Sequence, residues 1–389
     1  MRFWRLTILG ILIRSRFNHI PMTKTRFCIA LSLSIAIIGL LASCKPAAVR
    51  RTEVSIIGNA FYIDGAVTYR GRYWNNNKIE GLLMNARLVQ GVFDDANPET
   101  RKLFQYPDTG EWNPDRNTDE FVAAMPSWKE HGLLSFTLNL QGGSPTGYGN
   151  KSWNNSAFTP KGDLKPAYMD RLKRILDEAE TLKMVVILGY FYFGQDQNLE
   201  DESAVVAAVD NTTDWLLEKG YRNVLVELNN ESNIKAYDHE ILKPARVHEL
   251  LERVRSKRKN GFRLLVSTSF GGRYIPDANV VAVSDYVLIH GNGVKDPAFI
   301  KEMVERTKAV STYRGQPIVF NEDDHYEYAQ DANNFKYAVE SYASWGYFDF
   351  RRKGETDIKI GYQSVPVDWS ISHERKKAFF GYLKEITGE

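Results

Sequence analysis

Two glutamates in this chain each follow an asparagine at the end of an apolar run. Glu231 lies in LVELNNESN, residues 225–233, and Glu322 lies in PIVFNEDD, residues 317–324. Two carboxyl groups held ~5–5.5 Å apart can share a double displacement at a sugar, one as acid and base and the other as nucleophile. Glu231 and Glu322 are therefore candidate catalytic residues, provided that the fold brings them together.

The elements that must position these glutamates alternate along the chain. Eight short apolar runs are typical of strands buried on both faces, and helical patterns lie between them, as at 167–182, 244–255 and 373–386. The expected strands are 86–93, 133–140, 184–191, 223–229, 263–269, 285–290, 317–321 and 347–350. This order predicts an α/β fold, a (β/α)8 TIM barrel. A doubly wound open sheet is the alternative, and the lack of a glycine-rich phosphate loop after the first strand disfavours it.

A β-hairpin is predicted ahead of the barrel. Residues 54–72 alternate apolar and polar positions around Asp64-Gly65, a pair that favours a tight two-residue turn. We expect this N-terminal β-hairpin to cover the floor of the barrel.

Functional side chains of such a barrel gather at the C-terminal ends of its strands. Besides the two glutamates, those ends and the loops after them carry amides, a histidine and aromatic residues, which suit the hydroxyl groups and apolar faces of sugars. The candidate substrate-binding residues are Asn139, Gln141, Tyr192, Asn230, His290, Asn292 and Trp369.

The segment VELNNESN, residues 226–233, resembles the fourth-strand motif of clan A glycoside hydrolases, especially family 5. The resemblance implies that Asn230 binds a sugar hydroxyl, that Glu231 is the acid and base, and that Glu322 is the nucleophile. His290 lies where those enzymes carry a sixth-strand histidine. It further implies a retaining hydrolase of poly- or oligosaccharides that needs no cofactor.

The chain departs from the family pattern in three places. Ser232 replaces a proline, the second strand ends in LNLQGG without the expected arginine, and no tyrosine stands two residues after His290. The missing arginine and tyrosine would contact Glu322 in the family. We expect substitutes for them among Asn139, Gln141, Asn292 and Arg351. A divergent relative of family 5 fits these departures, and so does the alternative, a catalytically inactive surface lipoprotein that binds glycans.

A metal site is the less favoured interpretation of NEDDHYEY, residues 321–328. Its acidic residues and histidine are metal-ligand types, but no HExxH or HxH motif accompanies them. We expect no metal and no other cofactor.

The N-terminal region resembles a bacterial lipoprotein signal. Residues 22–43 run from a basic start through an apolar stretch to Leu41-Ala42-Ser43, directly before Cys44. We expect Cys44 to be lipidated and the protein to be exported and anchored in the bacterial cell envelope, with Lys45 favouring the outer membrane. An uncleaved transmembrane helix is the alternative.

The remaining boundaries follow from this signal. Residues 1–21 are interpreted as an extension upstream of the true start, 44–52 as a tether and 53–389 as the catalytic-type domain. Residues 1–43 carry six Lys and Arg and no Asp or Glu, which leaves 44 basic and 48 acidic residues beyond them. This balance does not favour nucleic-acid binding. We expect a monomer whose partners are a carbohydrate substrate and the membrane.

Overall fold

The computed structural model describes residues 52–148 and 153–389. All of them lie in one compact unit, Arg50–Glu389. The predicted extension, the signal segment, Cys44 and all of the tether except Thr52 lie outside the described residues. Within the described part, no helix is both long enough and apolar enough to cross a membrane.

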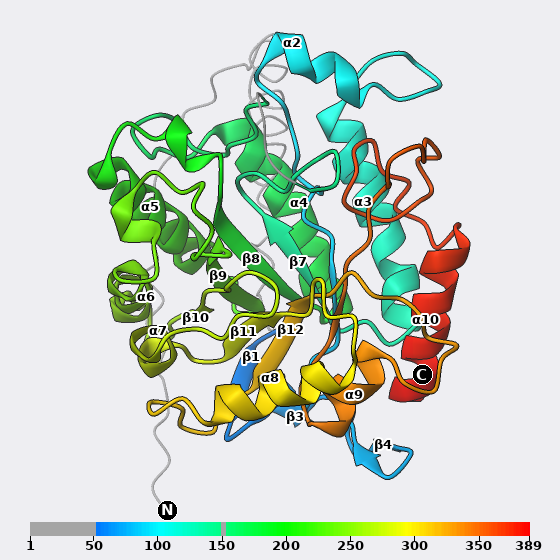
Figure 1. Ribbon diagram of the computed structural model, residues 1–389. Helices are drawn as coiled ribbons and strands as arrows, with labels where there is room; N and C mark the ends of the chain where they lie inside the picture. The colour runs from blue at the N-terminus through cyan, green and yellow to red at the C-terminus, as the bar shows by residue number, and fades with distance from the viewer. Residues whose placement is uncertain (1–51, 149–152) are drawn as a thin grey trace, which may run out of the picture. The chain divides into compact units, whose positions relative to one another are not determined.

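Eight parallel strands form the centre of the described unit (Figure 1). They are β6 (Asn85–Arg87), β7 (Ser135–Asn139), β8 (Val185–Tyr192), β9 (Val224–Asn230), β10 (Leu265–Ser267), β11 (Val287–His290), β12 (Ile318–Glu322) and β13 (Gly346–Tyr347). A strand lies at or beside each predicted place, although the eighth, expected at 347–350, overlaps β13 only at Tyr347. The first is shorter than expected, because a turn begins soon after Arg87.

The strands close into a ring. Six of them pair in the order β10-β9-β8-β7-β6-β13, and β11 pairs with β12. Ser344, just before β13, joins the two sets, since its N–H donates to Ile318 O at 3.0 Å and its carbonyl accepts from Phe320 N–H at 2.8 Å. On the other side, Asp285 N–H donates to Val266 O at 2.9 Å. The predicted TIM barrel is confirmed.

Helices surround the strands, with α5 to α7 on the left of Figure 1 and α3 and α10 on the right. They are α2 (Pro98–Arg101), α3 (Pro114–Glu130), α4 (Pro166–Leu182), α5 (Glu202–Lys219), α6 (Val247–Ser256), α7 (Ala278–Val283), α8 (Ala298–Lys308), α9 (Asn334–Glu340) and α10 (Glu374–Thr387). Short 3-10 helices are η1 (Lys102–Phe104), η2 (Asp196–Asn198) and η3 (Glu240–Leu242). In α4, the predicted apolar stripe, including Leu172 and Ile175, is buried against the barrel.

The N-terminal hairpin is confirmed and extended by one strand. β1 (Val54–Ile57), β2 (Ala60–Ile63) and β3 (Ala66–Val67) form an antiparallel sheet in which Asp64-Gly65 makes the β2–β3 turn. Val54 N–H donates to Arg222 O at 3.0 Å, just before β9, so this sheet lies at the N-terminal ends of the barrel strands. A second hairpin follows, β4 (Tyr73–Trp74) with β5 (Asn77–Lys78).

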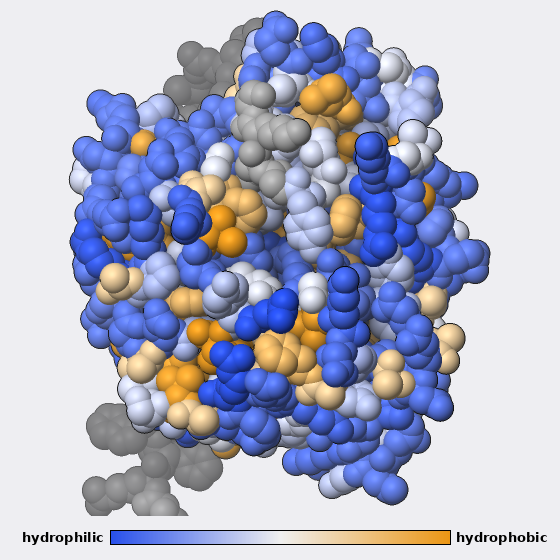
Figure 2. All heavy atoms as spheres, in the orientation of Figure 1, coloured by the Kyte–Doolittle hydropathy of each residue, from blue (hydrophilic) through white to orange (hydrophobic). Residues whose placement is uncertain are grey.

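The barrel strands are largely apolar, but several polar side chains are buried among them. Asn85, Arg87, Thr137 and Glu227 are each at most 1% exposed. Buried polar groups destabilise a fold unless they are paired, so a cluster of them indicates a function. On the face drawn in Figure 2, by contrast, hydrophilic residues make up most of the surface and hydrophobic ones appear in small groups.

Candidate active site

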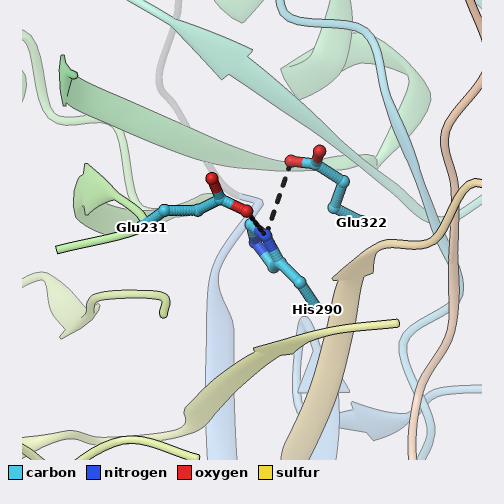
Figure 3. Close-up of side chains that lie close together, drawn as sticks. All are labelled: Glu231, His290 and Glu322. Atoms are coloured by element: carbon cyan, nitrogen blue, oxygen red, sulfur yellow. Dashed lines mark hydrogen bonds and ion pairs between the residues drawn. The ribbon is translucent and has the colours of Figure 1, made fainter. Parts of the chain in front are cut away.

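Glu231 and Glu322 face each other at the C-terminal end of the barrel (Figure 3). Glu322 is the last residue of β12, and Glu231 directly follows β9. One oxygen of each carboxylate and a ring nitrogen of His290 all lie within 4.8 Å of one another. The fold therefore brings together two glutamates that lie 91 positions apart in the sequence.

His290 lies between the two carboxylates. Its Nδ1 is 2.9 Å from Glu231 Oε1 and 3.6 Å from Glu322 Oε2, and its Nε2 is 4.0 Å from Glu227 Oε1. The strand register shifts between Ile289 and His290, an irregularity of the kind that re-aims a side chain. Burial lowers the pKa of His290, but the charges of Glu322 and Glu231 outweigh this and leave it above its usual value.

Arg87, on the first barrel strand, is the arginine that the sequence seemed to lack. Its Nε forms an ion pair with Glu322 Oε2 at 2.6 Å, and its Nη1 lies 3.7 Å from Glu227 Oε2. Nη2 donates to Asn230 Oδ1 at 2.8 Å. The second strand indeed ends without an arginine, and the partner of Glu322 is Arg87 of β6 and not the suggested Arg351.

Asn292 is a second partner of Glu322, as expected from the sequence. Its Nδ2 donates to Glu322 Oε1 at 2.6 Å. Burial is the largest influence on Glu322 and raises its pKa; Arg87, His290 and Asn292 lower it, Glu231 raises it, and the balance stays above the ordinary value. The four neighbours thus decide how easily this buried carboxylate ionises.

Glu231 is held in an unusual backbone conformation. Its φ is +53°, in the left-handed region that few residues other than glycine adopt. Its N–H donates to Ser269 Oγ at 2.9 Å, and the same hydroxyl donates to Glu227 Oε1 at 2.6 Å. Strain of this kind is typical of functional sites, where neighbours fix a side chain in one orientation.

Asn230 has one half of its amide free for a ligand. Arg87 occupies its Oδ1, while its buried Nδ2 has no hydrogen-bond partner among residues 52–148 and 153–389. Asn139, at the end of β7, is buried as well, and neither atom of its amide has a partner in the described part of the chain. Both side chains can therefore donate to a bound hydroxyl group.

Tyr192 lies close to the glutamates at the end of β8. Burial, followed by the charge of Glu322, raises the pKa of its hydroxyl, and Ser144 Oγ donates to that hydroxyl at 3.0 Å. Gln141 is used differently: its Nε2 donates to Gln195 O at 2.9 Å and to Ser156 Oγ at 3.2 Å. The structure gives Gln141 a role in holding loops, and a contact with substrate remains a prediction.

Trp369 and Arg351 do not lie where the sequence suggested. Trp369 is 2% exposed, stacks on Tyr362 and donates its indole N–H to Asn117 Oδ1 at 3.1 Å on helix α3. The loop after β13 packs this ring against Phe121 and Trp128 of helix α3, outside the ring of strands. Arg351 donates to the carbonyls of Val365 and Pro366 and is not a partner of Glu322.

Two clusters bring together residue types that bind metals. One is Glu231, His290 and Glu322; the other is Asp323, Asp324 and His325, whose candidate ligand atoms also lie within 4.8 Å of one another. His325 Nδ1 is 2.8 Å from Asp323 Oδ1, and although burial lowers its pKa, the two aspartates raise it to about 10. A protonated imidazole cannot coordinate a cation, so a metal ion would have to displace the proton of His325 to bind there.

No family model matches this chain, and no curated protein matches its sequence. Solved structures do match. A glycoside hydrolase family 5 structure from Bacteroides vulgatus is 15% identical, with a TM-score of 0.53 over 86% of this chain and 70% of that one. A β-1,4-D-mannanase from Cryptopygus antarcticus is 12% identical, with a TM-score of 0.51 over 87% of this chain and 95% of that one.

A second Bacteroides vulgatus structure, described as a candidate glycoside hydrolase, is 15% identical with a TM-score of 0.51. The match covers 84% of this chain but only 59% of that longer protein. At such identities the likeness establishes the fold and leaves the activity open. The chain has the TIM-barrel fold of the glycoside hydrolase family 5 structures.

Proposed function

We propose that this protein is a retaining glycoside hydrolase that cleaves a poly- or oligosaccharide through two glutamates. The observation that carries the proposal is the opposed pair, Glu231 and Glu322, with carboxylate oxygens within 4.8 Å at the mouth of the barrel. Retaining enzymes hold their carboxyl groups ~5–5.5 Å apart, whereas inverting enzymes leave ~6.5–9.5 Å for a water molecule. The short separation favours retention.

The unequal surroundings of the two glutamates assign their roles. Glu322 has the guanidinium of Arg87 at 2.6 Å and the Asn292 amide at 2.6 Å, which stabilise and orient an ionised carboxylate. Glu231 contacts neither of these groups and lies 2.9 Å from His290 Nδ1 instead. We infer that Glu322 is the nucleophile and that Glu231 carries the proton.

The reaction then proceeds in two steps. Glu322 attacks the anomeric carbon while the glycosidic C–O bond breaks and Glu231 gives its proton to the departing oxygen. A water molecule next attacks the same carbon, Glu231 takes the proton of that water, and the bond to Glu322 breaks. Two inversions restore the original configuration of the sugar.

The charges of the buried cluster favour one proton among its glutamates. One permanent cation, Arg87, faces three glutamates, Glu227, Glu231 and Glu322. If His290 is protonated, one negative charge is still unbalanced, and a single proton on one of the three glutamates removes it. Because uncompensated buried charge is costly, the neutral cluster is the favoured state of the free enzyme.

The inactive glycan-binding lipoprotein remains the second candidate, but its main support is gone. That interpretation depended on the missing arginine and tyrosine beside Glu322. In the structure, Arg87 and Asn292 both contact Glu322. A protein that only binds glycans also has no use for an opposed carboxylate pair in which Glu231 has a strained backbone.

The experiment that tests the proposal is hydrolysis of a panel of β-linked polysaccharides and aryl glycosides by the purified protein. Glu231→Gln and Glu322→Gln should each abolish activity, whereas Glu240→Gln, a change at an exposed glutamate, should not. Azide should rescue Glu322→Ala and give a glycosyl azide of inverted configuration. Full activity in both Gln variants would exclude this site, and glycan binding without hydrolysis would favour the binding protein.

We also propose that the protein is exported and held in the bacterial envelope by a lipid on Cys44. This proposal is supported by the sequence Leu41-Ala42-Ser43-Cys44 behind a basic and apolar segment. A carbohydrate-cleaving enzyme in that place would meet glycans outside the cytoplasm.

A further inference from the structure

Tyr148 combines strong exposure with a fixed position. Its side chain is 52% exposed, one of few large aromatic residues in the described part of the chain that reach this level. Its hydroxyl donates to Asp324 Oδ2 at 2.8 Å. Its ring makes T-shaped contacts with Phe350 and Phe348, at 4.7 Å and 5.6 Å between centroids. The ring is thus held by two neighbouring rings and through its hydroxyl, while about half of the side chain stays open to solvent.

The groups that hold Tyr148 are themselves fixed. Asp324 Oδ1 accepts from Gly293 N–H at 3.0 Å and lies 3.1 Å from the ring of His325. On the other side, Val365 N–H donates to Pro145 O at 2.8 Å and anchors the segment before Tyr148. The φ of Gly147 is +114°, and a Cβ there would come within 2.9 Å of the Phe350 ring, so glycine allows this close approach.

Tyr148 lies at the same end of the barrel as the candidate catalytic pair. Asp324 follows Glu322 by two residues, and Gly293 follows Asn292, which donates to Glu322. Phe348 and Phe350 come directly after β13, at the same end of the barrel. Burial and the charge of Asp324, followed by Glu322 and Glu231, raise the pKa of the Tyr148 hydroxyl, which places both glutamates within electrostatic reach.

An exposed, immobilised aromatic ring suits a pyranose. The axial C–H groups of β-linked sugars form apolar faces, and these faces pack on aromatic rings. A ring that is already ordered loses little conformational entropy when the sugar binds. Trp369, the residue that the sequence suggested for this purpose, is buried in the core and cannot serve.

We propose that Tyr148 is a sugar-binding platform at the mouth of the barrel, which stacks on a pyranose ring of a β-linked substrate and is held in place by Asp324, Phe348 and Phe350. This inference rests on the proposed glycosidase function. It assigns the platform to the loop after β7, and it assigns the binding contribution to the aromatic ring and not to the hydroxyl, which Asp324 already occupies.

Steady-state kinetics of the full-length protein tests the platform, with β-1,4-linked hexasaccharides of glucose, mannose and xylose as substrates. On the substrate that the wild type cleaves, Tyr148→Ala and Tyr148→Leu should each raise KM at least tenfold. Tyr148→Phe should change KM less than threefold, because it keeps the ring. Tyr73→Ala, a matched change at a tyrosine that is 58% exposed on β4, should leave KM unaltered.

The outcomes separate this inference from the proposed function. If the wild type cleaves a hexasaccharide and Tyr148→Ala keeps KM within twofold, the platform is excluded while the glycosidase proposal stands. If Tyr148→Phe raises KM as much as Tyr148→Ala does, the hydroxyl is the binding group and the inference is wrong. If the wild type cleaves and binds none of the three sugars, the proposed function and the platform fail together.

Discussion

Arg87 Nε lies 2.6 Å from Glu322 Oε2, and the two residues come from strands β6 and β12, 235 positions apart in the sequence. Both side chains are almost completely buried, at 0% and 4% exposure. Because Arg87 also contacts Glu227 and Asn230, one guanidinium joins three strands at the mouth of the barrel. The nucleophile proposed here therefore depends on a contact that also stabilises the fold.

The first prediction concerns the stability of this pair. Arg87→Met should lower the free energy of unfolding by about 3–5 kcal/mol, because it leaves buried carboxylates without their cation. Adding Glu322→Gln should restore at least about 1 kcal/mol, since one of those charges is then absent. Urea unfolding of the single and double variants measures this coupling. Arg171→Met, a change at another buried arginine, should combine additively with Glu322→Gln.

The second prediction concerns the acid side of the pH–rate profile. A nucleophile must be ionised, so activity falls as the pH drops through the pKa of Glu322. Asn292 donates to the Glu322 carboxylate and lowers this pKa, and Asn292→Ala should raise it further. The acid limb of kcat/KM against pH should move to higher pH. A limb that stays in place while activity falls evenly at all pH values would show that Asn292 acts on the substrate instead.

How far the sequence predicted this site depends on where each residue lies on its strand. Glu231, Glu322 and His290 could be found because each ends an apolar strand, and in a parallel barrel all such ends meet at one mouth. The strands were recognisable because they are buried on both faces. The register of the strands could not be recognised from the sequence, so the distances between the side chains had to come from the structure.

Arg87 was missed for a physical reason. An arginine inside an apolar strand is usually assumed to point outward, and only the convergence of three acceptors from β9 and β12 explains its burial. Its occurrence near the start of a largely apolar segment, 86–93, was the available signal. The prediction that Trp369 binds substrate was wrong because the path of the long loop that carries it does not follow from residue types.

The third prediction tests the lipid anchor. Expressed in bacteria, the protein should incorporate labelled palmitate, and Cys44→Ser should abolish the label because the acylated thiol is gone. Cys28→Ser is the matched control, since Cys28 lies in the segment that we expect to be removed. Labelling that survives in Cys44→Ser, or that is lost in Cys28→Ser, would contradict the predicted cleavage before Cys44.

The fourth prediction concerns Lys376, a buried lysine of α10 that is 0% exposed. Its Nζ donates to Asp368 O and lies 4.1 Å from the centre of the Tyr362 ring. Burial lowers its pKa from 10.5 to about 7. Between these values the unfolded chain binds one more proton than the folded one, so this residue makes stability rise with pH, by at most about 1.4 kcal/mol per unit.

Lys376→Met removes the titrating group and should therefore change the pH dependence more than the fold. The variant should gain stability over the wild type most at pH 7 and below, and this advantage should shrink steadily toward pH 10, where the wild-type lysine is neutral in the folded state and approaches neutrality in the unfolded state. Unfolding in urea at several pH values between 6.5 and 9.5 measures the difference. Lys377→Met, a change at an exposed lysine that is paired with Glu374, should give a curve parallel to that of the wild type. Parallel curves for Lys376→Met as well would mean that Lys376 stays protonated in the folded protein, held by Asp368 O and the Tyr362 ring.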